Sequence, residues 1–132
     1  MYDWVDKYIG IPFVSNGRSM EGCDCYGLVR LILMNEYNIM LPQLTDDYSD
    51  ALNINETAQL FAKQLPVLSA QKLTGPEERA VAIITEHGRP AHIGIYAGSG
   101  YILHTGIKTN SICQRESHPG LRGRIEGYYR VC

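Results

Sequence analysis

The order of helical and strand patterns along the chain predicts an α+β fold with a small antiparallel sheet. Apolar residues recur at helical spacing up to Gly75-Pro76, and after this break they recur with a period of two. Helices that precede all strands are typical of α+β proteins, whereas α/β proteins alternate the two. The 132 residues match one domain in length and contain no visible repeat or linker. We therefore expect residues 1–132 to form a single domain.

The helical part of the sequence begins weakly and then becomes strong. Apolar spacing predicts a helix over 2–9, and a composition of Gly, Pro, Ser and Asn predicts a loop from 10 to 22. The next helix should have Asp24 as its N-cap and end near Asn38. Its apolar stripe is formed by Leu28, Val29, Ile32 and Leu33.

An acidic connector and a second helix come before the strands. Residues 43–53 are polar and acidic, which predicts a solvated connector. Asn55 is a candidate cap for a short helix through Gln64. Runs with strand-like alternation then predict strands at 79–85, 91–97, 101–105, 110–114 and 125–131.

Composition and charge argue against several classes of function. Lys and Arg total 12 against 14 Asp and Glu, for a net charge of −2, so no basic surplus favours nucleic acid or an anionic membrane surface. The longest apolar run is far below the roughly 20 residues of a membrane span. The acidic start at residues 1–6 is the opposite of a signal peptide, so export by the standard route is not expected.

Cys25 is the most informative of the four cysteines. It follows the predicted N-cap, where the free amides of a first helical turn stabilise a thiolate and lower the pKa of a thiol. The alternative is that Cys25 is a small core residue. Cys23 is expected to pack, and Cys113 and Cys132 have no catalytic signature. Cys23-Asp24-Cys25 lacks the two-residue gap of zinc knuckles, so we expect no structural metal there.

Two histidines are predicted to share one face of a hairpin. A three-residue loop at 98–100 would pair Ile95 with Leu103. Because side chains alternate between the faces of a strand, His92 and His104 then become diagonal neighbours, opposite an apolar face. A two-residue loop would shift the register by one and separate the two histidines.

Cys25, His92 and His104 together have the composition of a thiol-based catalytic site. A cysteine activated by an imidazole that is held by a second polar group is the minimal arrangement for nucleophilic thiol chemistry. Gly94 lies between the histidines and is expected to leave room for the end of the helix. Two alternatives stay open: half-exposed strand histidines with no catalytic role, and a zinc site of the same three residues that lacks an obvious fourth ligand.

Three separated blocks carry a resemblance to a known family. They are 22–29 (GCDCYGLV), 92–98 (HIGIYAG) and 101–104 (YILH). In this order and spacing they resemble the NlpC-type papain-like cysteine peptidases, which are bacterial cell-wall endopeptidases. Residues 11–19 and 126–130 are more similar to the branch found in phage tails and prophages. The resemblance runs from about residue 8 to residue 130.

The resemblance implies a papain-like fold in which a cysteine-bearing helix packs on a small antiparallel sheet. It implies that Cys25 is the nucleophile, His92 the general base and acid, and His104 the residue that orients His92. The implied substrate is the stem peptide of peptidoglycan, cut next to D-glutamate through a thioester acyl-enzyme, with the Cys25 backbone amide as one oxyanion donor. No cofactor and no metal are implied.

Three positions depart from the family pattern. Phe13 stands where many relatives have a tyrosine near the oxyanion site, and its side chain cannot donate a hydrogen bond. Tyr26 replaces the serine common after the cysteine and is expected to narrow the cleft. Residues 78–81 replace the Gly-Asp usual before the first sheet strand. We take Asp24, Phe13 and Tyr26 as the candidate oxyanion or cleft residues.

Three functions therefore compete. The first is a peptidoglycan endopeptidase of a phage tail or of a host cell, with tail proteins as possible partners. The second is a tail-assembly component with the same fold and little or no activity. The third is thiol acyl-transfer or amidase chemistry on another substrate. The lack of an export signal favours a tail protein that is cytoplasmic until it is assembled into the virion; neither nucleic acid nor membrane is an expected partner.

Overall fold

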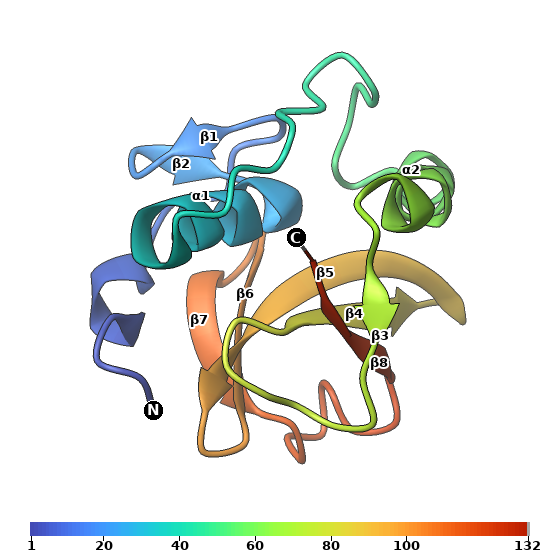
Figure 1. Cartoon of the computed structure of the whole chain (residues 1–132). Helices are drawn as coiled ribbons and strands as arrows, with labels where there is room; N and C mark the ends of the chain where they lie inside the picture. Colours follow the sequence, from blue (N-terminus) through green and yellow to red (C-terminus); the bar gives the residue numbers. More distant parts are fainter. Residues whose placement is uncertain (132) are drawn as a thin grey trace.

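The structure is a computed structural model that describes residues 1–131, and it has the predicted α+β architecture (Figure 1). Helices α1 (Cys25–Tyr37) and α2 (Ile54–Val67) pack on one face of a sheet. The strands are β1 (Arg18–Ser19), β2 (Gly22–Cys23), β3 (Gln71–Lys72), β4 (Val81–Glu86), β5 (Arg89–Gly98), β6 (Tyr101–Gly106), β7 (Asn110–Arg115) and β8 (Ile125–Arg130). The five predicted strand runs correspond to β4–β8, which confirms this part of the prediction.

The main sheet is antiparallel, with the strand order β3-β8-β4-β5-β6-β7. Strand β8 inserts between β3 and β4, so the last strand of the chain lies second from one edge of the sheet (Figure 1). Strands β1 and β2 form a separate small hairpin within the segment expected to be a loop. Residues 10–22 are therefore more ordered than their composition suggests, because the hairpin leads directly into α1.

Helix α1 agrees with the sequence prediction at both ends. The side chain of Asp24 accepts a hydrogen bond from the Gly27 N–H, which makes it the N-cap. Asn38 ends the helix in the left-handed conformation with φ 55°, and its N–H donates to the Leu33 carbonyl. Local sequence signals at the two ends are sufficient here to define the helix.

The other two helical predictions need correction. Helix α2 begins two residues earlier than predicted, because Asn53 rather than Asn55 accepts the capping hydrogen bond, from the Glu56 N–H. The helix also continues to Val67. The predicted helix over 2–9 is a single 3-10 turn, Val5–Tyr8, without a side-chain cap. The chain before this turn is held by the sheet, since the Tyr2 N–H donates to the Ala97 carbonyl.

The hairpin between β5 and β6 reaches the predicted register by a different route. Strand β5 ends at Gly98 and β6 begins at Tyr101, so the turn has two residues instead of three. A one-residue bulge at Ala97 compensates for the shorter turn, and Ile95 pairs with Leu103 as predicted. The bulge therefore preserves the face on which each side chain of the hairpin was expected.

The sheet has a core on each face. The helix side carries the larger cluster, to which Ile93, Ile95 and Leu103 contribute as predicted. The opposite face has a smaller cluster around Ile102, covered by the segment between β7 and β8, whose Leu121 is 1% exposed. The sequence indicated only the first of these two cores. Within residues 1–131, no helix has the length and apolar character needed to cross a bilayer.

Candidate active site

Cys25 is the first residue of α1, and its sulfur lies against strand β5. The Sγ atom accepts hydrogen bonds from the backbone N–H groups of Ile93 and Tyr26. The residue is buried, with 5% of its surface exposed. Ile93 directly follows His92 in strand β5, so this contact connects the thiol to the strand that carries His92.

Strand pairing explains why the Ile93 N–H is available to the thiol. The Tyr96 N–H donates to the Ala80 carbonyl on the β4 side of the strand. Because successive backbone groups of a strand point to opposite neighbours, the Ile93 N–H points toward β6. Pairing between β5 and β6 ends at Ile95 and Leu103, however. The sulfur of Cys25 therefore occupies a gap in the sheet where a strand carbonyl would otherwise accept this hydrogen bond.

His92 and His104 lie on the same face and contact each other, as the hairpin analysis predicted. Nε2 of His92 lies 2.9 Å from Nδ1 of His104, and the two rings cross at 73°. Nε2 of His104 lies 2.7 Å from Oε1 of Gln114, on strand β7. His92 is buried, and His104 and Gln114 are half-buried. A continuous line of hydrogen-bonding side chains thus crosses from β5 over β6 to β7.

Gly94 has a different role from the one expected. A Cβ atom at this position would lie 2.8 Å from Cγ2 of Ile102, 3.0 Å from the Leu103 carbonyl oxygen and 3.1 Å from Cβ of His104. The close neighbour is therefore strand β6 and not the end of α1. The missing side chain lets β6 approach closely enough for His104 to reach His92.

Burial dominates the electrostatics of the thiol and the imidazole. The pKa of the Cys25 thiol is raised to about 12, first by burial and then by the charge of Asp24, although two N–H donors act in the other direction. The expected lowering by the helix N-terminus is therefore outweighed. The pKa of His92 is lowered to about 3 by burial and by the nearby His104 and Arg124. In the resting site the thiol and the imidazole are both neutral.

Asp24 is fully buried and organises the segments that precede and surround Cys25. Its Oδ1 accepts from Gly27 N–H and from Nη1 of Arg18 at 3.0 Å, and its Oδ2 accepts from Asn16 N–H and from the Tyr48 hydroxyl. A carboxylate only accepts hydrogen bonds, so it cannot donate one to an oxyanion. Asp24 instead anchors the β1 hairpin and the 38–53 segment to the start of α1.

The other two candidate cleft residues also have structural contacts. The Tyr26 hydroxyl donates to the Pro42 carbonyl at 2.7 Å, and the Arg18 guanidinium lies over its ring. Tyr26 is 3% exposed and thus faces the interior rather than narrowing an open cleft. The Phe13 backbone N–H donates to Oδ1 of Asn110. Among the described residues, neither side chain offers a hydrogen bond toward the thiol.

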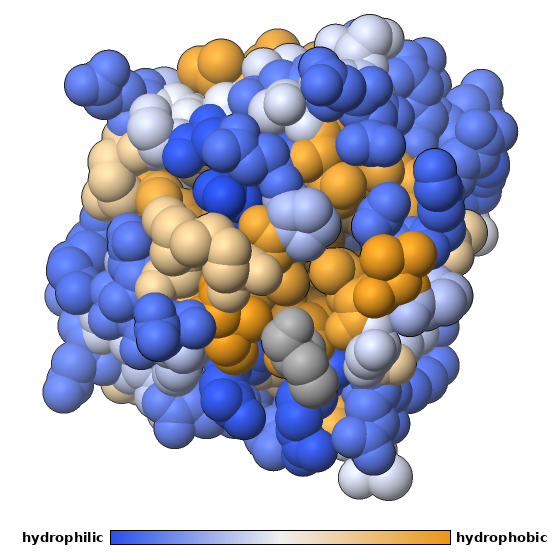
Figure 2. Space-filling view, turned by 45° about the horizontal axis from the view of Figure 1, so that its top comes forward, coloured by the Kyte–Doolittle hydropathy of each residue, from blue (hydrophilic) through white to orange (hydrophobic). Residues whose placement is uncertain are grey.

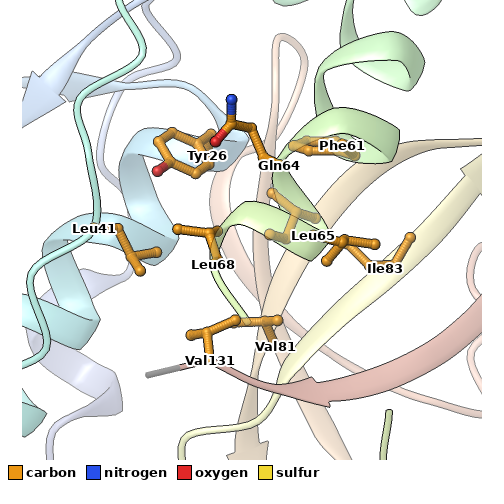
Figure 3. Close-up of a pocket in the computed structure, with 10 residues that line it drawn as sticks. Tyr26, Leu41, Phe61, Gln64, Leu65, Leu68, Val81, Ile83 and Val131 are labelled. Atoms are coloured by element: carbon orange, nitrogen blue, oxygen red, sulfur yellow. The ribbon is translucent and has the colours of Figure 1, made fainter. Parts of the chain in front are cut away.

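Two pockets lie near the site, one apolar and one polar. The apolar pocket lies between the helices and the sheet, with Tyr26 and Phe61 at opposite sides and Ile93 in its lining (Figure 3). In the space-filling view of Figure 2, apolar side chains gather in the middle of the face that is shown. The polar pocket is on the opposite side of the sheet and is lined by Glu86, His92, His104, Thr105, Gly106, Thr109, Ile112, Gln114, Leu121 and Arg124.

Sequence reasoning missed Gln114, Arg124 and Tyr48. Gln114 follows Ile112 by two residues, and Ile112 pairs with His104, so all three side chains share one face. Extending the alternation into the next predicted strand could have found it, but only with the register of β6 and β7 known. Arg124 donates to the Thr85 carbonyl from a segment with no strand pattern. No sequence signal pointed to Arg124 or to Tyr48.

The remaining cysteines lie outside this arrangement. Cys23 is a buried free thiol and Cys113 a half-buried one, and Cys132 lies beyond the described residues. Among residues 1–131, no group of three His, Cys, Asp or Glu side chains is arranged to hold a metal ion. Cys25, His92 and His104, the residues of the zinc alternative, are therefore not placed as a metal site.

Comparison with solved structures finds the same fold in several bacterial proteins. The NlpC/p60 domain of the peptidoglycan hydrolase SagA matches with a TM-score of 0.62 and 16% identity, over 97% of this chain and 92% of that one. An NLP/P60-family protein from Staphylococcus aureus, described as similar to a lipoprotein, matches with a TM-score of 0.62 and 20% identity. That match covers 98% of this chain but only 39% of the other. The P60 domain of an antigen from M. avium subspecies paratuberculosis matches with a TM-score of 0.61 and 16% identity, over 96% and 88%.

A search of curated protein sequences gives no match. At this low sequence identity, the structural matches show a shared fold only. The match to a family model, in contrast, is evidence from the sequence itself. The NlpC/P60 model matches residues 10–125. This range includes helix α1, strands β5 and β6, and the two histidines. The chain therefore belongs to the NlpC/P60 family of cysteine peptidases.

Proposed function

We propose that the chain is a cysteine endopeptidase of peptidoglycan stem peptides, in which Cys25 is the nucleophile, His92 the general base and acid, and His104 the orienting residue. Family membership makes the chain a cell-wall peptidase of the cysteine type. SagA, whose domain shares its fold, is described as a peptidoglycan hydrolase. The residue roles and the bond cut next to D-glutamate are the finer parts of the proposal.

The observation that carries the proposal is the neighbourhood of three groups: the Cys25 sulfur contacts Ile93, the residue after His92, and His92 contacts His104. Cys25 Sγ accepts the N–H of Ile93, the neighbour of His92 in the strand. His92 uses Nε2 for the contact with His104 at 2.9 Å, which leaves its Nδ1 as the ring nitrogen available to the thiol. A nucleophile, a base and an orienting group are therefore provided in sequence along three adjacent elements.

The neutral state of the resting site determines how the reaction would start. His92 takes the proton of the Cys25 thiol as the sulfur attacks the scissile carbonyl carbon. The tetrahedral intermediate collapses when His92 returns this proton to the leaving amine, and a thioester remains on Cys25. Water, deprotonated by His92, then attacks the thioester and releases the new carboxylate and the free thiol. The backbone N–H of Cys25, at the N-terminus of α1, is one donor to the oxyanion.

The weakest part of the site is the oxyanion contribution from side chains. Phe13 cannot supply the hydrogen bond that a tyrosine at this position would donate, and Asp24 and Tyr26 are engaged elsewhere. Loss of one oxyanion donor costs roughly 100-fold or more in kcat. We therefore expect a slower peptidase than relatives that keep the tyrosine, and Phe13→Tyr should accelerate it.

Digestion of purified peptidoglycan, with mass spectrometry of the released peptides, tests the proposal. The wild type should produce new termini at one bond, next to D-glutamate. Cys25→Ala should lose this activity by about 10⁴-fold or more, whereas Cys113→Ala, which changes a free thiol on β7 away from the site, should keep it. Full activity in Cys25→Ala would overturn the mechanism, and another cleaved bond would overturn only the D-glutamate assignment.

The burial of the thiol supports a second candidate, a phage tail component, in one respect only, which is the low activity expected of it. Cys25 is 5% exposed and its pKa is raised to about 12. A substrate must therefore displace the side chains that cover the thiol before it can react. Iodoacetamide alkylation of each cysteine, followed by peptide mass spectrometry from acid to alkaline pH, separates the two functions. A peptidase should show alkylation of Cys25 that slows when His92 is replaced by Ala. A dormant site should show none in the folded state.

A further inference from the structure

We propose that Gln114 is a positioning residue that sets the direction of the hydrogen-bond chain behind the nucleophile. Its amide oxygen fixes the tautomer of His104 and, through it, that of His92. The inference rests on the proposed function, because the direction matters for catalysis only if Cys25 gives its proton to His92. The observations are two distances, 2.7 Å between Gln114 Oε1 and His104 Nε2, and 2.9 Å between His104 Nδ1 and His92 Nε2.

The chemistry of each atom along the chain allows one direction only. An amide oxygen has no hydrogen to give, so Nε2 of His104 must be the protonated nitrogen that donates to Gln114. A neutral imidazole carries one N–H, and Nδ1 of His104 is then an acceptor. Nε2 of His92 must therefore donate to it, and Nδ1 of His92 is left with a free lone pair. This lone pair is what a base requires to take the proton from the Cys25 thiol.

The opposite direction would disable the same three residues without moving them. If a donor stood in place of the Gln114 oxygen, His104 would carry its proton on Nδ1 and donate to His92. His92 would then be protonated on Nδ1, toward the thiol, and could not accept a second proton and stay neutral. Histidine tautomers are set by the hydrogen bond that the other ring nitrogen makes, so one acceptor at the end of the chain decides the state of the base.

The surroundings of Gln114 support this role over a purely structural one. Strand β7 pairs with β6 over its whole length, which fixes Gln114 opposite Ile102 on the face that carries both histidines. The guanidinium of Arg124 donates to the Thr85 carbonyl at 2.8 Å and borders the same pocket. This cation, which also lies 3.9 Å from Oε1 of Glu86, adds to burial in opposing a second proton on either ring. The pair is thereby kept neutral, which is the condition under which the tautomer matters.

Long-range proton–nitrogen NMR spectra of the protein labelled with ¹⁵N-histidine test the proposal directly. In the wild type at neutral pH, both His92 and His104 should show a protonated Nε2 and an unprotonated Nδ1. Gln114→Met, which keeps the length of the side chain but has no strong acceptor, should give mixed tautomers at both residues. Gln114→Glu, which keeps an acceptor oxygen, should retain the wild-type tautomers.

The catalytic consequence is measured on soluble muropeptides released from peptidoglycan by a muramidase. Gln114→Met should lower kcat by roughly 10- to 1,000-fold with little change in KM, which is less than the ~10⁴-fold cost of a fully imposed wrong tautomer. Gln114→Glu should recover most of this loss. Gln59→Met, the same substitution at an exposed position of α2, is the matched control and should not alter kcat or the histidine spectra.

The two readouts separate failure of this inference from failure of the proposed function. A wild-type His92 protonated on Nδ1, or unchanged tautomers in Gln114→Met, would overturn the role of Gln114 whatever the activity. A wild type that does not cleave muropeptides but shows the predicted tautomers and their loss in Gln114→Met would uphold the hydrogen-bond direction and remove only the catalytic function.

Discussion

The two faces of the sheet hold their reactive groups in different ways. On the helix side, the thiol of Cys25 lies in the large apolar core and next to an apolar pocket lined by Tyr26 and Ile93. On the other side, His92 and His104 line a polar pocket over a much smaller core. The link between the two sides is Ile93, whose N–H is free of pairing with β6 and contacts the Cys25 sulfur.

This difference suggests a division of labour. The helix side fixes the position of Cys25, the proposed nucleophile, since nearly every residue of the first three turns of α1 is buried. The histidine side carries the proposed proton transfer, and its polar groups lie outside the main core. Changes on the helix side should therefore mainly cost stability, and changes on the histidine side should mainly cost turnover.

Asp24→Asn should have the largest effect on stability. The carboxylate is 0% exposed and pairs with Arg18 at 3.0 Å, so an amide leaves a buried guanidinium without its counterion. Its NH₂ group would also face donors from Asn16 and Tyr48. Loss of one partner of a buried ion pair costs about 3–5 kcal/mol. Chemical denaturation should show a loss of this size.

The same variant should change the nucleophile in a defined direction. The charge of Asp24 helps to raise the pKa of Cys25, so its removal should lower that pKa and shift alkylation of Cys25 to lower pH. Asp46→Asn, in the exposed part of the same connector, is the control and should alter neither property. A stable Asp24→Asn protein with an unchanged alkylation profile would show that the carboxylate does not organise this end of α1.

A matched pair of leucines tests the two faces directly. Leu33 lies in the helix-side core and Leu121 in the other core, and both are at most 1% exposed. Replacing either by Ala should cost about 2–5 kcal/mol, with the smaller loss where the surroundings can collapse. Only Leu121 borders the pocket of His92 and His104. At a temperature where both variants are folded, kcat should fall for Leu121→Ala and stay constant for Leu33→Ala.

The sequence predicted most of this framework where the signals were local. Helix α1 could be predicted at both ends because a cap, an apolar stripe and a left-handed Asn38 lie within one segment. The shared face of His92 and His104 followed from alternation, although the turn is shorter than expected. Here the Ala97 bulge restored the register. The apolar face of the hairpin was thus a better guide than the turn residues.

The rest depended on contacts between distant segments. The dipole of α1 is a local property and predicted a lowered pKa for Cys25, but burial beneath other elements raises it. Asp24 was predicted correctly as a cap, yet its partners Arg18 and Tyr48 come from two other segments. Gln114 could not be assigned because the turn between β6 and β7 had to be known before the strands could be aligned.

Gly94→Ala should disturb the junction between the two faces with a moderate loss of stability. The added methyl group would lie 3.0 Å from the Leu103 carbonyl and 3.1 Å from Cβ of His104, neither of which can move without shifting β6. Overpacking of this kind costs about 1–3 kcal/mol. Because His104 would be pushed from His92, kcat should fall even in the folded protein.

The control for Gly94→Ala is Gly75→Ala. A Cβ atom at Gly75 meets no other atom within 4 Å, and this glycine has no positive φ. Stability and kcat should therefore stay close to those of the wild type. Equal effects of the two substitutions, measured by thermal melting and by muropeptide hydrolysis, would contradict the idea that Gly94 is required for the approach of β6.

A last expected effect is an acid dependence of stability that comes from the histidine side. The pKa of His92 in the folded protein is lowered to about 3 by burial, while an unfolded chain should bind the proton near pH 6.5. Between these values the unfolded state binds more protons, so stability rises with pH and is lost as the pH falls from about 6.5 toward 3. The slope reaches at most about 1.4 kcal/mol per pH unit for each such histidine.

His92→Gln should flatten this slope, and the comparison with other histidines identifies its source. The pKa of His104 is also lowered by burial, so part of the acid dependence should persist in the variant. His87→Gln changes an exposed turn residue and should leave the slope of the wild type intact. Urea denaturation at several pH values between 4 and 7 measures all three proteins. If His92→Gln kept the full slope, the buried imidazole would not be the neutral base that the catalytic mechanism needs, and the histidine side would lose its distinct role in proton transfer.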